Sequence, residues 1–437
     1  MLAILGFLMV ATFLFLIISK RLSPFIGLLV IPVIFGLIGG VGPELGTLAM
    51  EGIVKSAPTA LLILFAILYF GIMIDAGLFD PLTNRMIKIV KGDPLKIIVG
   101  TAILAGIVGF DGDGSTTIMI CVSAFLPLYK RLGISPLILI TIVVLQIGIT
   151  TLVPWGGPAG RVATVLNLEA TSLYTAMLPG MIVSLFYVVF VAFMIGKRER
   201  ARLGINYHDV NLTAESEIAA TITSELSSEV TYKRYKLIWV NALLSLIIMV
   251  AIVLEWLPAP FLFIVGTAIA LLINYPKLEL QRKIVAAHSS NALAVTVIIL
   301  AAGVFSGILK GSGMSEGMAQ SLISIIPESL GAHFPIIVAI LSAPALFLIG
   351  ADAFYFGIIP VLAETASNYG ISAMDIGIAS LYGSNFGFIG PLVGAMYLGA
   401  EMTGNHIGDI QKNAAKWAVG ILIIYIIAGV ITGTMTI

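Results

Sequence analysis

Long apolar segments separated by short polar connections run along almost the whole chain. Many of them reach the roughly 20 residues that a helix needs to cross the hydrocarbon core of a bilayer. The pattern therefore predicts an all-α membrane protein. We expect membrane helices near residues 2–19, 25–40, 57–75, 136–168, 172–196, 237–256, 260–275, 289–309, 374–403 and 414–436, with those at 136–168 and 374–403 interrupted.

Two further regions, 95–131 and 333–368, each contain two short apolar segments joined by a polar break that includes glycine. Each segment alone is short for a membrane crossing. Non-helical backbone at membrane depth is tolerated where it is buried in protein or lines a cavity. We therefore predict one re-entrant helical hairpin in each region.

The second half of the chain repeats the first at an offset of 236 positions (260 − 24 = 236). We expect residues 1–196 and 237–437 to form two five-helix repeats, inverted because each has an odd number of crossings. Paired Gly/Pro-interrupted segments in two halves are typical of the substrate site of a secondary transporter. The matched landmarks are Pro24-Phe25 with Pro260-Phe261, Gly71-Ile72 with Gly307-Ile308, and Gly77 with Gly313.

Lys and Arg residues gather in the connections expected on one side of the membrane, as in cytoplasmic loops. The stretch 310–335, expected outside, carries one Lys and no Arg. This distribution predicts about ten membrane crossings, with both termini outside the cell. Two amphipathic stretches, 78–92 and 314–326, are expected to lie along the membrane surface. The polar segment 197–236 has basic ends and an acidic middle, which predicts a cytoplasmic linker, with a regulatory role as the alternative.

Composition supports the membrane assignment, because only 11% of the residues are charged, against about 25% in soluble proteins. The zero net charge gives no overall basic surface for nucleic acid. The single cysteine, Cys121, excludes an intramolecular disulfide and a multi-cysteine metal site. The apolar N-terminus lacks the basic region and cleavage pattern of a signal peptide, so we expect it to be the first membrane helix.

The first hairpin has the sequence GFDGDGSTT at its tip, residues 109–117. Asp111 and Asp113 flank a glycine, and carboxylates are suitable ligands for a hard cation. A pair of aspartates at membrane depth is costly and indicates function, whereas an N-cap aspartate in a solvated loop is the alternative. The start of a helix offers free N–H groups to substrate carboxylates, and the hydroxyl candidates there are Ser115, Thr116 and Thr117.

The first interrupted helix contains VPWGGPAGR, residues 153–161. Its prolines remove helix donors, and its glycines, including Gly156 and Gly157, expose backbone to a substrate. Arg161 follows in an apolar context, and its planar fork can bind a carboxylate through two hydrogen bonds. A structural salt bridge to Asp111 or Asp113 is the alternative. Thr150 is a further candidate donor to the substrate.

The second half supplies a different set of groups. Its hairpin, GADAFYFG, keeps one aspartate, Asp352, and its interrupted helix, GSNFGFIGP, supplies Ser384, Asn385 and Gly387. The site thus combines the guanidinium of Arg161 with three carboxylates that we assign to a cation, those of Asp111, Asp113 and Asp352. A ligand that carries both signs of charge, such as a metal–carboxylate complex, accounts for both.

The motifs GFDGDGSTT, VPWGGPAGR and the pair GADAFYFG/GSNFGFIGP resemble those of the bacterial metal–citrate:proton symporters of the ion transporter superfamily. The resemblance covers the chain except its central linker. It implies inverted repeats with opposed hairpins, and proton-driven uptake of citrate complexed with Mg²⁺ or Ca²⁺ across a bacterial cytoplasmic membrane. The metal then travels with the substrate, and no cofactor is permanently bound. Analogy with the superfamily also suggests a homodimer.

Three alternatives remain. A metal-free di- or tricarboxylate symporter and a cation/proton antiporter are the other transporter classes. An intramembrane aspartyl protease would use Gly-x-Gly-Asp, but Phe110 stands where DGDG would need the first glycine. We therefore expect a transporter and not an enzyme.

Overall fold

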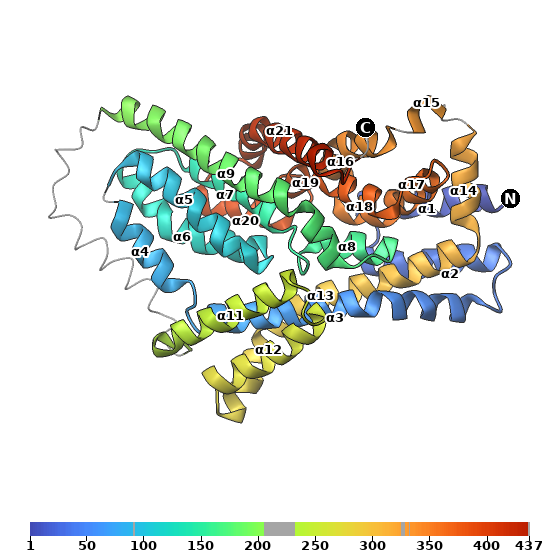
Figure 1. Cartoon of the computed structure of the whole chain (residues 1–437), viewed down its shortest axis with the longest axis horizontal. Coiled ribbons are helices and arrows are strands. Elements are labelled where there is room, and N and C mark those ends of the chain that lie inside the picture. Colours follow the sequence, from blue (N-terminus) through green and yellow to red (C-terminus); the bar gives the residue numbers. More distant parts are fainter. Residues whose placement is uncertain (91, 205–231, 325–327, 332, 436–437) are drawn as a thin grey trace.

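The computed structural model describes residues 1–90, 92–204, 232–324, 328–331 and 333–435, and all regular elements in these ranges are helical (Figure 1). The fold class predicted from the apolar pattern, all-α, is confirmed. The helices of the first half are α1 (Leu2–Ile18), α2 (Pro24–Ile38), α3 (Leu45–Asp75), α4 (Asp80–Val90), α5 (Pro94–Val108), the 3-10 turn η1 (Gly109–Asp111), α6 (Gly114–Arg131), α7 (Pro136–Thr150), α8 (Gly157–Leu166) and α9 (Ala170–Leu203).

The second half follows the same order of long, short and broken helices. Its elements are η4 (Tyr235–Leu237), α11 (Ile238–Val253), α12 (Ala259–Asn274), α13 (Leu278–Gly311), α14 (Met314–Ile323), α15 (Glu328–Gly331), α16 (Phe334–Ile349), the π-helix η5 (Ala353–Ile358), α17 (Ile359–Ser367), α18 (Ala373–Leu381), α19 (Ser384–Phe388), α20 (Gly394–Thr403) and α21 (Ile407–Thr432).

The predicted breaks appear where glycine, proline and aspartate interrupt the apolar pattern, but several helix ends differ from the prediction. Helices α3 and α13 begin at Leu45 and Leu278, well before the predicted starts at 57 and 289. The added segments contain Glu51 and Lys55 in α3 and Glu279 and Lys283 in α13, and Glu and Lys are good helix formers that the apolar pattern does not detect. Most of the predicted linker 197–236 lies outside the described residues. Its first residues are helical and form the end of α9, which continues to Leu203.

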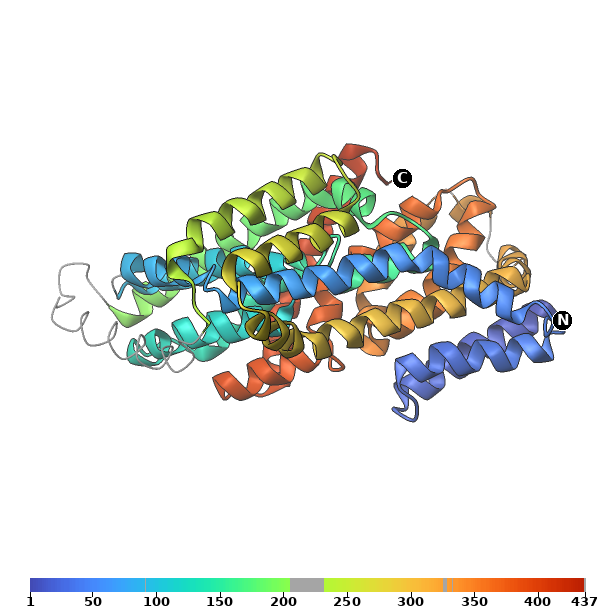
Figure 2. The ribbon, with the colours of Figure 1, turned by 90° about the horizontal axis from the view of Figure 1, so that it is seen from below.

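Helices α3 and α13 lie side by side in antiparallel directions along one edge of the molecule (Figure 1). Gly52 near the start of α3 touches Gly303 and Gly307 near the end of α13, while Gly71 of α3 touches His288 of α13. Small residues allow such close backbone approach between membrane helices. Helices α1 and α2 pack beside this pair at the end where the N-terminus lies (Figure 2).

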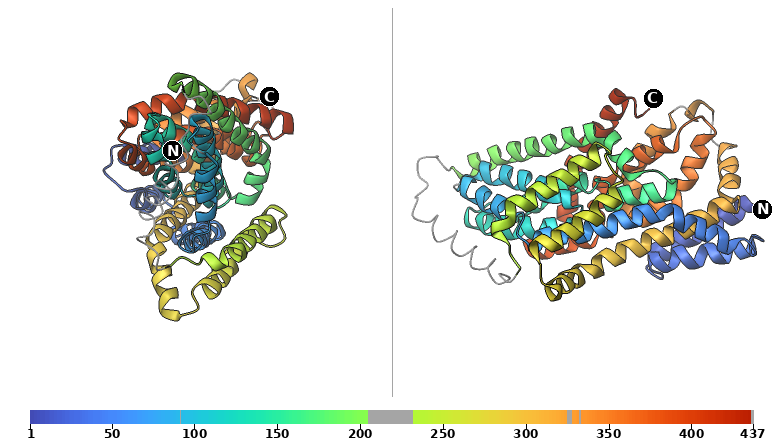
Figure 3. Two further views of the ribbon diagram at one scale, coloured as in Figure 1. Left: turned by 90° about the vertical axis from the view of Figure 1, so that its left-hand side faces the viewer. Right: turned by 60° about the horizontal axis from the view of Figure 1, so that its bottom comes forward.

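Helix α7 lies deep in the molecule, since every residue from Leu139 to Thr150 is buried. Helices α11 and α12 are much less buried, and they project from the body of the molecule (Figure 3). They expose large apolar side chains such as Trp239, which is 85% exposed. An exposed apolar face of this kind requires an apolar environment.

Six helices of the described chain are long and apolar enough to cross a membrane, and six shorter apolar helices accompany them. The chain is therefore a multi-pass membrane protein.

Candidate functional site

The tip of the first hairpin turns at Gly112, whose φ of +82° lies in the left-handed region that glycine adopts without strain. Asp113 then caps α6: its Oδ1 accepts the Ser115 N–H at 3.1 Å, and its Oδ2 accepts the Thr116 N–H at 3.2 Å and the Thr116 hydroxyl at 2.5 Å. Asp113 is exposed, whereas Thr117 is buried and donates to the Asp113 carbonyl oxygen at 3.1 Å. The capping alternative noted for this aspartate is thus what the structure contains.

Asp111 has a different environment, although it lies only two residues away. Its side chain is 5% exposed, and its Oδ1 accepts the Asp113 N–H at 2.9 Å. Its Oδ2 is buried and has no hydrogen-bond partner among the described residues. An unpaired carboxylate oxygen in a buried position is costly, so Asp111 is the aspartate of this tip that needs a cation or a proton.

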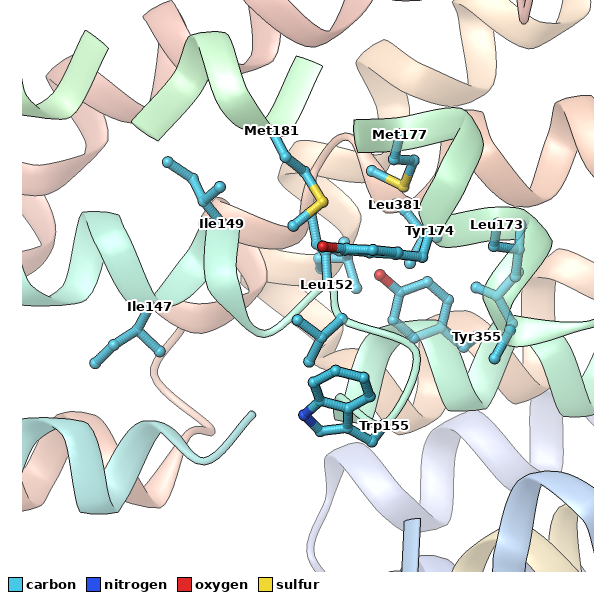
Figure 4. Packing of buried hydrophobic residues seen from close by; sticks show 14 of the residues in the cluster. Ile147, Ile149, Leu152, Trp155, Leu173, Tyr174, Met177, Met181, Tyr355 and Leu381 are labelled. Atoms are coloured by element: carbon cyan, nitrogen blue, oxygen red, sulfur yellow. The ribbon is translucent and has the colours of Figure 1, made fainter. Parts of the chain in front are cut away.

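The first helix break packs directly on this tip. Trp155, between α7 and α8, donates its Nε1–H to the Phe110 carbonyl oxygen at 3.1 Å. Thr150 is fully buried, and its hydroxyl donates to the Gln146 carbonyl oxygen at 3.1 Å within its own helix. Figure 4 shows Trp155 below Leu152, in the apolar packing around this break. The Trp155 ring also stacks on Phe70, with a centroid separation of 5.7 Å.

The glycines of the break are required by close contacts. A Cβ on Gly156 would lie 1.8 Å from the Thr151 carbonyl oxygen, and a Cβ on Gly157 would lie 2.6 Å from Nη1 of Arg161. Any side chain at Gly157 would thus displace the guanidinium. Gly157 thus brings backbone close to the group that we expect to bind substrate, and Gly156 allows the tight turn of the break.

Arg161 joins the two halves of the chain. Its Nε donates to Oδ1 of Asp352, at the tip of the second hairpin, over 2.7 Å. The two side chains are 19% and 22% exposed, so the pair is only partly buried. The salt-bridge alternative, with Asp111 or Asp113 as the partner, is wrong about the partner: η5 and α17 of the second half pack against α8, and Asp352 is the aspartate that binds Arg161. Both Nη atoms of Arg161 remain without a hydrogen bond to any described residue.

The second helix break is held by α7. Ser384 donates to the Gly148 carbonyl oxygen at 3.0 Å, and Nδ2 of Asn385 donates to the Leu145 carbonyl oxygen at 2.9 Å. Both side chains are buried, and Oδ1 of Asn385 has no partner in the described part of the chain. A Cβ on Gly387 would contact Leu346 of α16 at 3.2 Å. These residues fix the break against its neighbours and leave one amide oxygen available.

Each hairpin tip therefore meets a break from the other half. The second tip is bonded to the first break through Arg161, and Gly114 of the first tip packs so closely on Phe388 of the second break that a Cβ would lie 2.5 Å from the ring. Within the described ranges, no three His, Cys, Asp or Glu side chains form a group able to hold a metal. Asp111, Asp113 and Asp352 thus do not converge on one point in this conformation.

Two contact residues were missed by sequence reasoning, Trp155 and Phe388, because aromatic residues were attributed to packing alone. A tryptophan between proline and glycine in VPWGGP was an available signal. Phe388 lies in the corresponding glycine-rich break of the second half, and only the tertiary structure pairs it with Gly114.

Comparison with known proteins identifies the family of the chain. The family model described as citrate transporter matches residues 13–383. The chain is 47% identical to the citrate transporter of Bacillus subtilis (strain 168) and 45% identical to the Mg(2+)/citrate complex secondary transporter of the same organism, each over the full length of both proteins. The crystal structure of the Alcanivorax borkumensis YdaH transporter, which has an unusual topology, has a TM-score of 0.53 at 16% identity over 90% of this chain and 89% of its own.

The relatives are transporters, so the chain is a membrane transporter and not an enzyme. It belongs to the CitMHS family of citrate transporters.

Proposed function

We propose that the chain is a secondary active transporter that imports citrate complexed with a divalent metal such as Mg²⁺ or Ca²⁺, coupled to protons, by alternating access. The name of the relative that carries a Mg(2+)/citrate complex supports the substrate. The observation that carries the proposal is the Arg161–Asp352 ion pair between the first helix break and the second hairpin tip.

The ion pair explains why the ligand carries both signs of charge. Without substrate, the guanidinium and the carboxylate neutralise one another. A metal–citrate complex replaces both partners, because a citrate carboxylate can bind Arg161 while the metal binds Asp352 directly or through water. Free citrate would satisfy Arg161 and leave Asp352 unpaired. Removing one partner of a buried ion pair costs about 3–5 kcal/mol, and partial exposure of this pair lowers that cost. The complex is therefore preferred over free citrate.

Asp111 provides the second acidic position of the proposed site. Its free, buried Oδ2 requires a positive charge or a proton, and it lies on the tip that Trp155 ties to the first break. Asp113 serves this tip as the cap of α6. We assign Asp111 and Asp352 to the cation side of the substrate or to the coupled proton, and Arg161 to its carboxylate side.

The repeat organisation belongs to the same proposal. The antiparallel crossing of α3 and α13, and the same helix order in residues 1–196 and 237–437, support two inverted repeats. Helix α5 turns through η1 directly into α6, and α16 turns at Gly350 into η5 and α17. These two units supply the re-entrant hairpins 95–131 and 333–368 of the proposal.

The proposal is tested by citrate uptake against metal concentration in proteoliposomes for Asp111→Asn and Asp352→Asn. We expect each variant to need more metal for half-maximal uptake or to change its preference between Mg²⁺ and Ca²⁺. Asp409→Asn is the matched control, since Asp409 is an exposed residue in the first turn of α21. Unchanged metal and pH dependence in both site variants, at normal protein levels, would refute the assignment.

A further inference from the structure

A second polar cavity lies apart from the hairpin tips, between α3, α8 and α13. Its volume is about 260 Å³, just below the roughly 300–1,000 Å³ of pockets that hold drug-sized ligands. This volume suits a ligand of a few carbon atoms. The cavity is lined by Glu51, Gly52, Lys55, Thr164, Asn167, Gly303, Ser306, Gly307, Lys310 and Gly311.

Glycines bring the two long helices together beside this cavity. A Cβ on Gly52 would lie 2.0 Å from the Gly303 carbonyl oxygen, and a Cβ on Gly307 would lie 2.3 Å from the Leu48 carbonyl oxygen. The helix backbones are therefore in contact, and no side chain from these positions can enter the space. The closely packed glycines give the cavity a fixed floor.

The other end of the same helix pair has different side chains at the matching positions. By the offset of 236 positions, Gly52 corresponds to His288, Gly307 to Gly71 and Gly311 to Asp75 (288 − 52 = 307 − 71 = 311 − 75 = 236). At that other end the His288 ring packs on Gly71, and its Nε2 lies 2.8 Å from Oδ2 of Asp75. The equivalent crossing thus has an imidazole packed against Gly71, whereas the helices at Gly52 are in direct backbone contact and the cavity lies beside that contact.

The cavity has charged groups of both signs. Lys55 and Lys310 line it together with Glu51. Glu364 also acts electrostatically on Lys310 from the second hairpin unit. Thr164 and Asn167 add neutral polar groups. Two ammonium groups together with the carboxylates of Glu51 and Glu364 are suitable for a small polycarboxylate anion that carries a metal, because such a complex presents both signs of charge.

The cavity and Arg161 lie along one face of α8. Thr164 follows Arg161 by three residues, which is about 4.5 Å along the helix axis, and residues three apart lie on the same side of a helix. The cavity is also at the end of α3 and α13 that the distribution of basic residues places outside the cell.

We propose that this cavity is a second binding site for a small carboxylate anion, at which the transported complex is held on the external side before it reaches Arg161. The identity of the anion rests on the proposed function. Lys55 and Lys310 bind its carboxylates, and Glu51 faces its cationic side.

The test is uptake of magnesium–citrate by Lys55→Gln, Lys310→Gln and the double variant in proteoliposomes with known protein orientation. Each substitution should raise the half-saturating concentration about fivefold, as expected for a partly exposed charge pair worth about 1 kcal/mol, with a larger rise in the double variant. The rise should appear only when substrate is offered from the face where Leu45 lies. Lys310→Arg should restore most of the affinity, because it keeps the charge.

Lys416→Gln is the matched control, because it removes the same charge from an exposed position on α21. Half-saturation in the Lys55 and Lys310 variants equal to that of this control would overturn the second site and leave the proposed function intact. Failure of the proposed function would look different, since the unmodified protein would then show no metal-dependent citrate uptake. Equal effects from both faces would also overturn the external holding site.

Discussion

Replacing Arg161 with lysine removes the planar fork from the proposed site while keeping its charge. The Nε of Arg161 binds Asp352 over 2.7 Å, and both Nη atoms remain available on the other edge of the group. When the metal–citrate complex replaces this pair, the planar guanidinium can hold a citrate carboxylate through two parallel hydrogen bonds, and a lysine ammonium cannot reproduce this geometry.

The expected magnitude follows from one lost hydrogen bond to a charged group. Such bonds contribute about 1.5–3 kcal/mol. The pair is 19% and 22% exposed, so the lower end of that range applies. Since about 1.4 kcal/mol corresponds to a factor of ten, we expect the half-saturating concentration of magnesium–citrate to rise about tenfold in Arg161→Lys.

The assay is the initial rate of labelled citrate uptake in proteoliposomes that contain equal amounts of protein. Arg202→Lys is the control, because Arg202 is an exposed arginine paired with Glu199 near the end of α9. An unchanged half-saturating concentration in Arg161→Lys would refute the reasoning and leave Arg161 as a structural partner of Asp352.

Two further predictions concern contacts that position the site. Trp155→Phe keeps an aromatic ring but loses the bond to the Phe110 carbonyl oxygen, so we expect a loss of about 1 kcal/mol in substrate binding, measured as a several-fold weaker half-saturation. Gly52→Ala places a Cβ 2.0 Å from the Gly303 carbonyl oxygen, so it should lower the free energy of unfolding by about 1–3 kcal/mol or more, as overpacking does in a core. Gly46→Ala on the same helix is the control, because no atom lies within 4 Å of its Cβ, and it should leave the melting temperature unchanged. Equal melting temperatures of the two variants would contradict the close helix crossing.

The sequence predicted the helix order and the positions of the breaks because both depend on local chemistry. Apolar runs of membrane length form helices, and glycine, proline and aspartate interrupt them, whatever the rest of the chain does. The capping role of Asp113 is equally local, since its partners are Ser115 and Thr116, and the sequence raised it as an alternative.

The partners of the site could not be predicted in the same way. Arg161 and Asp352 are 191 residues apart, and their pairing depends on how the two halves pack. The same holds for Ser384, whose hydroxyl binds the Gly148 carbonyl oxygen of the other half. The sequence indicated which polar groups are costly in a membrane, but their mutual distances follow from tertiary packing.

The central claim is that citrate and metal cross the membrane as one complex. Its most direct test is uptake into proteoliposomes of citrate and Ca²⁺ or Mg²⁺ that carry different labels, with an imposed proton gradient. If citrate and metal cross as one complex, both labels accumulate together in a constant ratio, and a chelator stronger than citrate abolishes uptake of both. Citrate accumulation that continues without divalent metal, or with no metal label inside the vesicles, would contradict it.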